Sequence, residues 1–149
     1  MKNRVIRLGK ELGKPGPRES GDQIRELTKL WLEGFQLAVN LKDYELGCRL
    51  FSPRVYSFGT VAPIAKGLEE LVKRQWEKRW PNIVEFSFDI DVSKMIVSPP
   101  HVICVTTWAS QNVDKTELSG RATLVLQGQR MDDGPVELRC VHSHFSISP

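Results

Sequence analysis

Hydrophobic residues in the first third of the chain recur at the spacing of an amphipathic helix. The apolar positions are Ile24, Leu27, Leu30, Trp31, Phe35 and Ala38, and charged residues occupy the opposite face. Ser20, followed three residues later by Gln23, forms a capping-box signature before this pattern. The pattern therefore predicts a helix over about residues 21–40.

A second, shorter helix is predicted after Asp43, whose carboxylate is a suitable N-cap. Its apolar stripe extends to Phe51, and Pro53 ends it because a residue before proline is disfavoured in helical geometry. The β-branched and aromatic residues 55–59 then predict a short strand.

A third helix is predicted between Gly67 and Pro81. Glu69 and Glu70 lie in its first turn, and basic residues lie in its last turn, as the helix dipole favours. Its apolar face consists of Leu68, Leu71, Val72 and Trp76.

From about residue 86 the hydrophobic period changes from helical to two. Alternation over residues 86–92 predicts a half-buried strand, and further strands are expected over 102–109, 118–126 and 136–147. Residues 132–135 carry a hairpin signal. Helices followed by an antiparallel meander of four strands predict an α+β fold. Helices packed on one face can curl such a sheet into a cone with a pocket inside.

Composition narrows the class of protein. The chain has 149 residues, 40% of them hydrophobic and 26% charged, which is typical of one globular domain. Residues 1–20 hold six basic and two acidic residues, whereas residues 21–149 hold 15 basic and 16 acidic ones. We therefore expect a flexible basic leader over 1–20 and a near-neutral domain over 21–149. A near-neutral domain argues against nucleic-acid binding, and the lack of a long apolar run argues against a membrane span.

The number and spacing of the cysteines indicate the cellular compartment. Cys48, Cys104 and Cys140 are odd in number and lack the spacing of a disulfide framework. This favours reduced thiols and a cytoplasmic location.

The order of these elements resembles the nuclear transport factor 2-like superfamily, and within it the SnoaL-like and ketosteroid-isomerase-like branch. The most specific stretches are residues 120–126 (GRATLVL) and 141–146 (VHSHFS). They resemble the paired last strands of small bacterial SnoaL-like proteins and the association domain of calcium/calmodulin-dependent kinases. The resemblance covers about residues 22–148, without the leader.

The resemblance implies a cone-shaped antiparallel sheet packed against about three helices. It also implies a small apolar or aromatic molecule in the cone, handled by an isomerase, cyclase or dehydratase through acid–base chemistry. Other members are non-catalytic dimeric ligand-binding or assembly modules, so that alternative stays open. A homodimer through the outer face of the sheet is implied in either case.

Two histidines are the first candidates for chemistry. His142 and His144 are two residues apart on a predicted strand and therefore share one face. They could act as acid and base near neutral pH, or lie at a dimer interface on the outer face. A metal site would need a third ligand, for which only Cys140 or His101 is available. Cys140 lies two residues before His142, so alternation predicts that it shares the histidines' face. We nevertheless expect no metal and no cofactor.

Arg121 is the other candidate, because it is a lone cation within an apolar strand. The resemblance favours a pocket position, where it would contact a carboxylate or enolate; the alternative is a salt bridge to Glu85, Asp89 or Glu117. The resemblance also places Tyr56 near a proton-donor position. The remaining pocket candidates are Trp108, Thr123 and Phe145.

Overall fold

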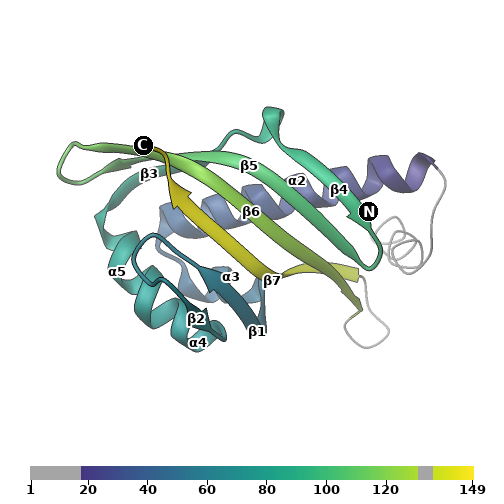
Figure 1. Ribbon diagram of the computed structural model, residues 1–149, viewed down its shortest axis with the longest axis horizontal. Coiled ribbons are helices and arrows are strands. Elements are labelled where there is room, and N and C mark those ends of the chain that lie inside the picture. The colour runs from purple at the N-terminus through teal and green to yellow at the C-terminus, as the bar shows by residue number, and fades with distance from the viewer. Residues whose placement is uncertain (1–17, 131–135) are drawn as a thin grey trace.

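The computed structural model describes residues 18–130 and 136–149 and has two layers, a curved sheet and a set of helices (Figure 1). The expected leader over 1–17 and the hairpin signal at 132–135 lie outside the described residues. The helices are α2 (Arg18–Leu41), α3 (Tyr44–Arg49), α4 (Leu68–Leu71) and α5 (Glu77–Arg79). The strands are β1 (Phe51–Phe58), β2 (Ala65–Lys66), β3 (Ile83–Phe88), β4 (Lys94–Ser98), β5 (His101–Asn112), β6 (Glu117–Arg130) and β7 (Val136–Ile147).

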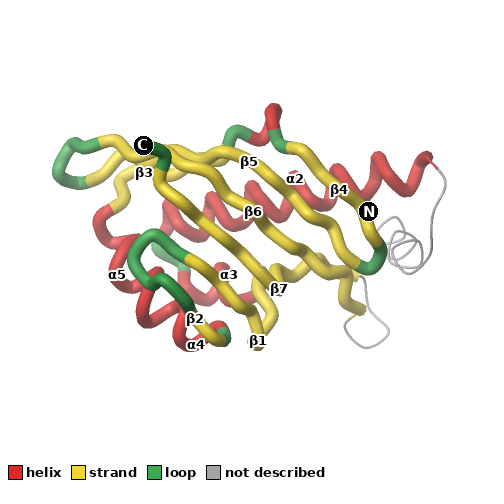
Figure 2. Tube along the Cα trace, in the orientation of Figure 1, coloured by secondary structure: helices red, strands yellow, loops and turns green. Residues whose placement is uncertain are grey.

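The long helix α2 lies behind the sheet in the views of Figures 1 and 2 and covers one of its faces. It begins at Arg18, so Ser20 lies within the helix and not at its N-cap, contrary to the capping-box prediction. Its apolar stripe is buried at Ile24, Trp31 and Phe35, as the helical spacing predicts. This covered side is called the inner face below, and the opposite side is the outer face.

Asp43 caps α3 as predicted, because its carboxylate accepts a hydrogen bond from the Leu46 amide at 3.0 Å. The boundary after it differs from the prediction. The helix ends at Arg49, and Phe51 already begins β1, so the strand starts four residues earlier than expected. Phe51 is buried, as its place in the predicted apolar stripe implied, although it lies in a strand and not in a helix.

The third helical segment is interrupted by a π-helical turn, Val72–Trp76, between α4 and α5. Such turns are uncommon and frequently lie at functional sites. A 3-10 turn, Trp80–Asn82, then ends the segment where the Trp-Pro sequence predicts.

The sheet is mixed and open. Its strand order is β2-β1-β7-β6-β5-β3, and β4 pairs with β5 beside β3. The antiparallel pairs β3–β5, β5–β6 and β6–β7 match the predicted meander, but β1 pairs with β7 in parallel. The α+β architecture with a curved sheet is therefore confirmed, and a wholly antiparallel sheet is wrong.

The predicted strand over residues 86–92 stops at Phe88. Its last part is a 3-10 turn, Ile90–Val92, followed by β4, which periodicity did not predict. The carbonyl of Asp89 accepts hydrogen bonds from the hydroxyls of Ser93 and Thr106 at 3.1 and 3.2 Å. These side-chain bonds, one of them from the neighbouring strand β5, stabilise a turn that alternation alone cannot reveal.

The free edge of β3 is covered by polar side chains of α2. Asn40 accepts a hydrogen bond from the Phe86 amide at 2.7 Å and donates to the Phe86 carbonyl at 3.0 Å. Gln36 accepts from the Phe88 amide at 3.0 Å. These bonds satisfy edge groups that would otherwise be free to pair with another chain, and they dock the helix to the sheet.

A bulge in β7 reverses the side of the sheet on which its side chains lie. His142 pairs with Val125 and Cys140 with Leu126, so the intervening Val141 has no partner on β6. Before the bulge Leu138 and Cys140 are buried; after it Ser143 is buried and His144 is exposed. The prediction that Cys140 shares a face with the histidines is therefore wrong, because it ignores the extra residue.

Candidate functional site

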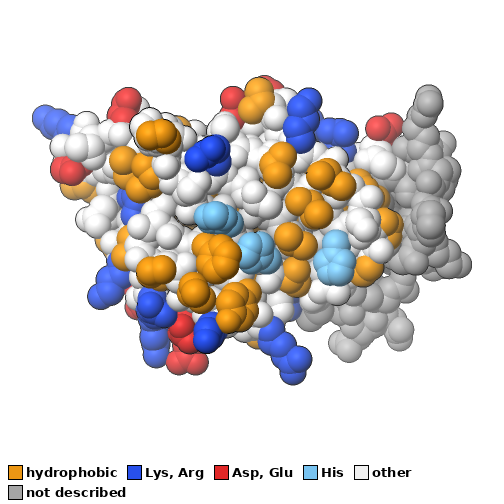
Figure 3. Space-filling model, viewed as in Figure 1, with side chains coloured by type: hydrophobic (Ala, Val, Ile, Leu, Met, Phe, Trp, Pro, Cys, Tyr) orange, Lys and Arg blue, Asp and Glu red, His pale blue; other side chains and the backbone are white. Residues whose placement is uncertain are grey.

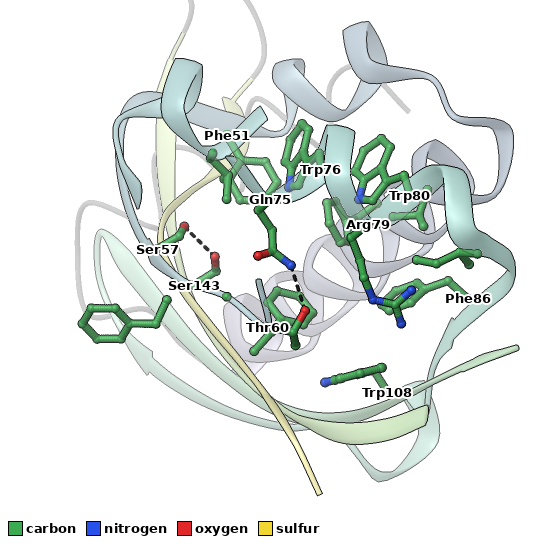
Figure 4. Close-up of a pocket in the computed structure, with 17 residues that line it drawn as sticks. Phe51, Ser57, Thr60, Gln75, Trp76, Arg79, Trp80, Phe86, Trp108 and Ser143 are labelled. Carbon is green, nitrogen blue, oxygen red and sulfur yellow. Dashed lines mark hydrogen bonds between the residues drawn. The ribbon is translucent and has the colours of Figure 1, made fainter. Parts of the chain in front are cut away.

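The interior hollow of the fold lies between the inner face of the sheet, α2 and the helical segment 68–82 (Figure 4). Its volume is about 60 Å³, well below the roughly 300 Å³ at which small-molecule sites begin. The lining residues are Phe35, Val39, Phe51, Ser57, Phe58, Gly59, Thr60, Leu71, Gln75, Trp76, Arg79, Trp80, Ile83, Phe86, Trp108, Ser143 and Phe145. The expected pocket exists, but side chains fill most of it.

Aromatic rings do most of the filling, and Phe35 of α2 is at their centre. Its ring centroid lies 5.6 Å from that of Trp31, 5.9 Å from those of Trp76 and Trp80, and 6.1 Å from that of Phe145. Trp76 and Trp80 also stack on one another at 4.6 Å. Rings at these distances form a close-packed core.

The polar groups on the wall are paired with one another. The hydroxyls of Ser57 and Ser143 share a buried hydrogen bond with their oxygens 2.7 Å apart. Gln75 donates to the Thr60 hydroxyl at 2.9 Å and accepts from the amides of Val61 and Ala62 at 2.8 Å each. The π-helical turn thus aims Gln75 at the loop after β1 and holds that loop against the cavity (Figure 4).

Arg79 is the ionisable residue of the lining. Its guanidinium donates to Asn112 Oδ1 at 3.1 Å and to Ser110 Oγ at 2.9 Å. Burial lowers the pKa of Arg79, and the nearby Asp114 carboxylate opposes that shift. The lining has no carboxylate, imidazole, thiol or phenol, so it offers no general base at neutral pH.

The residues predicted for the site divide between the two faces. Trp108 and Phe145 line the cavity. Arg121, Thr123 and Tyr56 do not line it, and they lie on the outer face with His142 and His144. The placement of Arg121 in the cone is therefore wrong. Among the described residues it forms no ion pair with Glu85, Asp89 or Glu117 either.

The outer face carries a group of apolar side chains and histidines that we call the outer patch (Figure 3). It consists of Tyr56, Phe58, Ile96, Ile103, Val105, Val125, His142 and His144. Four of its apolar members are well exposed: Tyr56 by 46%, Phe58 by 36%, Ile96 by 58% and Val105 by 38%. Apolar residues gathered in this way on a folded surface are typical of an interaction site.

The histidines are organised around the ring of Phe58. Its centroid lies 5.4 Å from that of His142 and 5.3 Å from that of His144, both nearly edge-on. His142 Nδ1 also lies 2.7 Å from the Tyr56 carbonyl oxygen, so this nitrogen is the protonated one if it donates there. The Phe58 ring therefore contacts both imidazoles on the outer face.

Sequence reasoning missed Ser57, Gln75 and Arg79 as cavity residues. Arg79 stood out only as a cation in the last turn of a helix, and its polar partners are 31 and 33 residues away in the chain. Ser57 and Ser143 are 86 residues apart. No local signal marks such pairs.

The cysteines are free thiols. Burial raises the pKa of Cys104 to about 11 and also raises that of Cys140. Across residues 18–130 and 136–149, no three His, Cys, Asp or Glu side chains converge as metal ligands. Within the same ranges, no helix is both long and apolar enough to cross a membrane.

No protein-family model matches the chain, and no curated protein sequence matches it significantly. Solved structures do. A candidate dehydratase from the NTF2-like family of Streptomyces avermitilis aligns with a TM-score of 0.70 at 19% identity, over 87% of this chain and 99% of that one. The CaMKII hub of S. rosetta aligns with a TM-score of 0.67 at 18% identity, over 83% and 95%.

A candidate ketosteroid isomerase from Shewanella frigidimarina aligns with a TM-score of 0.62 at 15% identity, over 78% of this chain and 91% of that one. Identities this low carry the fold and not the chemistry. The neighbours agree with the resemblance found in the last two strands and in the order of the elements. The chain therefore has the nuclear transport factor 2-like fold.

Proposed function

We propose that this protein is an assembly module that forms a homodimer through the outer patch, and that it is not an acid–base enzyme. The observation that carries the proposal is the contrast between the cavity and the outer patch. The cavity is about 60 Å³ and lacks a general base, whereas the outer patch exposes large apolar side chains and two histidines. Covering that patch removes apolar surface from water, which is the main driving force of association.

The charges around the outer patch support a second copy of this chain as its partner. Glu85 and Glu117 flank Gln111 at one end of the outer face. Lys94 pairs with Val105, which lies six residues before Gln111 on β5. At about 3.3 Å per residue, the acidic and basic ends are therefore about 20 Å apart. Two copies packed face to face about a two-fold axis that lies in the interface, perpendicular to β5, would place the acidic end of one over the basic end of the other.

The histidines and Arg121 then have roles at the interface. His142, His144 and Tyr56 belong to the outer patch, and Arg121 pairs with Thr107 beside it. The hub neighbour from S. rosetta is consistent with assembly as one use of this fold. These residues act by contact with the partner copy under this proposal, not by moving protons.

The test is the oligomeric state of the wild type and a matched pair of variants. We expect the wild type to be a dimer by sedimentation equilibrium. Val113→Glu should weaken this association no more than slightly, because Val113 lies in the turn after β5. Val105→Glu replaces an apolar contact with a carboxylate that must lose its hydration on association, even with Lys94 opposite it. It should therefore weaken the dimer roughly 30-fold or more. A monomeric wild type at high concentration, or an unchanged dimer in Val105→Glu with native circular dichroism, would overturn the proposal.

A small-molecule site in the cavity is the second candidate function. Arg79 favours it, because its guanidinium is bonded to the neutral oxygens of Asn112 and Ser110 and faces aromatic walls. A thermal-shift screen with small aromatic acids tests it. A stabilisation lost in Arg79→Gln supports the candidate, whereas equal shifts in both proteins, or none, contradict it.

A further inference from the structure

A second hollow lies outside the cavity and away from the outer patch. It is an open groove of about 560 Å³ between α2, the α3–β1 junction and the start of β7. Its lining is Leu27, Leu30, Trp31, Arg49, Leu50, Glu137, Leu138 and Arg139. This volume is within the range of about 300–1,000 Å³ that small-molecule sites occupy. The volume of the cavity is below that range.

The floor of the groove is apolar and already organised. The Leu50 carbonyl accepts hydrogen bonds from Trp31 Nε1 and from the Cys140 amide, each at 2.9 Å. These bonds join α2, the α3–β1 junction and β7. Leu30, on the α2 side, remains 56% exposed although it is a large apolar residue. A ligand with a hydrocarbon part would cover it without rearranging the floor.

Arg139 supplies the polar end of the groove. Its side chain is only 19% exposed, and its Nε is buried with no hydrogen-bond partner among the described residues. Glu137 Oε2 lies 3.9 Å from Arg139 Nη2, too far for a hydrogen bond. The exposed part of the guanidinium is therefore its Nη edge, which has no hydrogen-bond partner among the described residues. That edge matches a carboxylate, which can accept two parallel N–H bonds from it.

We propose that the groove binds an aliphatic monocarboxylate of the medium-chain fatty-acid type. The carboxylate bonds to the Arg139 guanidinium, and the hydrocarbon chain lies over Leu30, Trp31 and Leu50. Arg49, exposed at the rim, adds a second positive charge. Neither the dimer nor the cavity is needed for this site, so it goes beyond the function proposed above.

The ligand's charge and chain are tested separately with decanoate and decanol, measured by isothermal titration calorimetry on the full chain. Decanoate should bind one per chain, and Arg139→Met should weaken it about tenfold or more, since a charge-assisted pair of hydrogen bonds is lost. Decanol should bind weakly and equally to both proteins. Equal decanoate affinities in both proteins would overturn the role of Arg139.

The apolar half of the site has a matched control on the same helix. Leu30→Glu should abolish decanoate binding, whereas Leu37→Glu, equally polar and at a residue 51% exposed outside the groove, should leave it unchanged. Glu137→Gln should strengthen binding severalfold because it removes a carboxylate near the ligand's own.

Other occupants of the groove give different results. If decanoate does not bind to the full chain, the proposal is overturned. The groove is then left to a segment of the chain itself or to a protein partner. Affinity that falls as the protein concentration rises also overturns it, since a second copy then covers the groove. Saturable binding independent of protein concentration, lost in Leu30→Glu, supports it.

Discussion

The two faces of the sheet are built from alternate residues of the same strands, yet they have opposite roles. On the inner face, Trp108 and Leu124 are buried in a continuous core. On the outer face, Val105 and Arg121 are exposed, and the histidines surround Phe58. The chemistry-bearing residues of these strands are therefore separated from the cavity by one step of alternation. Catalysis in the cone would need polar residues on inner-facing strand positions. Here Ser57 and Ser143 are hydrogen-bonded to each other, and Ser110 and Asn112 accept hydrogen bonds from Arg79.

The largest expected effect comes from removing an inner-face ring. Trp108→Ala should lower the free energy of unfolding by about 3–5 kcal/mol, because it leaves a cavity among Phe86 and Phe145. Thr107→Ala, one residue away on the outer face, should change it by about 0.5 kcal/mol or less. Urea denaturation of both variants measures the difference. Similar losses in the two variants would mean that the inner and outer faces contribute equally to the free energy of unfolding.

A smaller effect is expected where the inner face allows no side chain. A Cβ at Gly120 would collide with the Ser146 carbonyl oxygen and the Trp108 ring. Gly120→Ala should therefore cost about 1–3 kcal/mol of unfolding free energy, since β6 and β7 must separate locally. Ser119→Ala, exposed on the neighbouring position, should be nearly neutral. Thermal unfolding monitored by circular dichroism tests the pair, and a neutral Gly120→Ala would show that β7 yields easily.

The smallest signal is the reactivity of the thiols in the native state. Burial raises the pKa of Cys104 to about 11, so less than about one per cent of that thiol is ionised at pH 8. Cys140, also buried and with a raised pKa, should be equally slow, and Cys48, which is half-buried, should be modified first. The Cys104 rate should keep rising with pH beyond the ordinary thiol range.

A thiol-reactive dye, with mass spectrometry to assign the sites, measures these rates. Denaturant should equalise the three cysteines, which serves as the control. Rapid labelling of Cys140 without denaturant would contradict a stably closed inner face at the β7 bulge.

Much of the architecture could be predicted because it depends on short-range patterns. Helical spacing located α2 to within three residues at its start, and Asp43 marked the start of α3. Period-two alternation located β5 and β6. Alternation failed at Asp89, where side-chain hydrogen bonds from residues 4 and 17 positions away hold a turn. Alternation also failed after Cys140, because Val141 has no partner on β6 and reverses the faces of the residues that follow it.

The candidate site was less predictable for the same reason. Trp108 and Phe145 were identified because large aromatic residues on strands tend to face a core. Arg121 was misplaced, because a lone cation in an apolar strand is compatible with either face until the register of β6 is known. Arg79 and Arg139 were not considered, because their surroundings come from distant parts of the chain.

The helices, the meander and the fold class were predictable from the amino-acid sequence, since they depend on the spacing of apolar residues and on local caps and turns. Three other properties became visible in the folded structure alone: the cone is filled, the histidines face outward, and Arg139 borders a groove. Those properties depend on ring packing, on one bulge and on the meeting of α2 with β7. Packing and register are set by contacts between distant residues, and therefore no local pattern contains them.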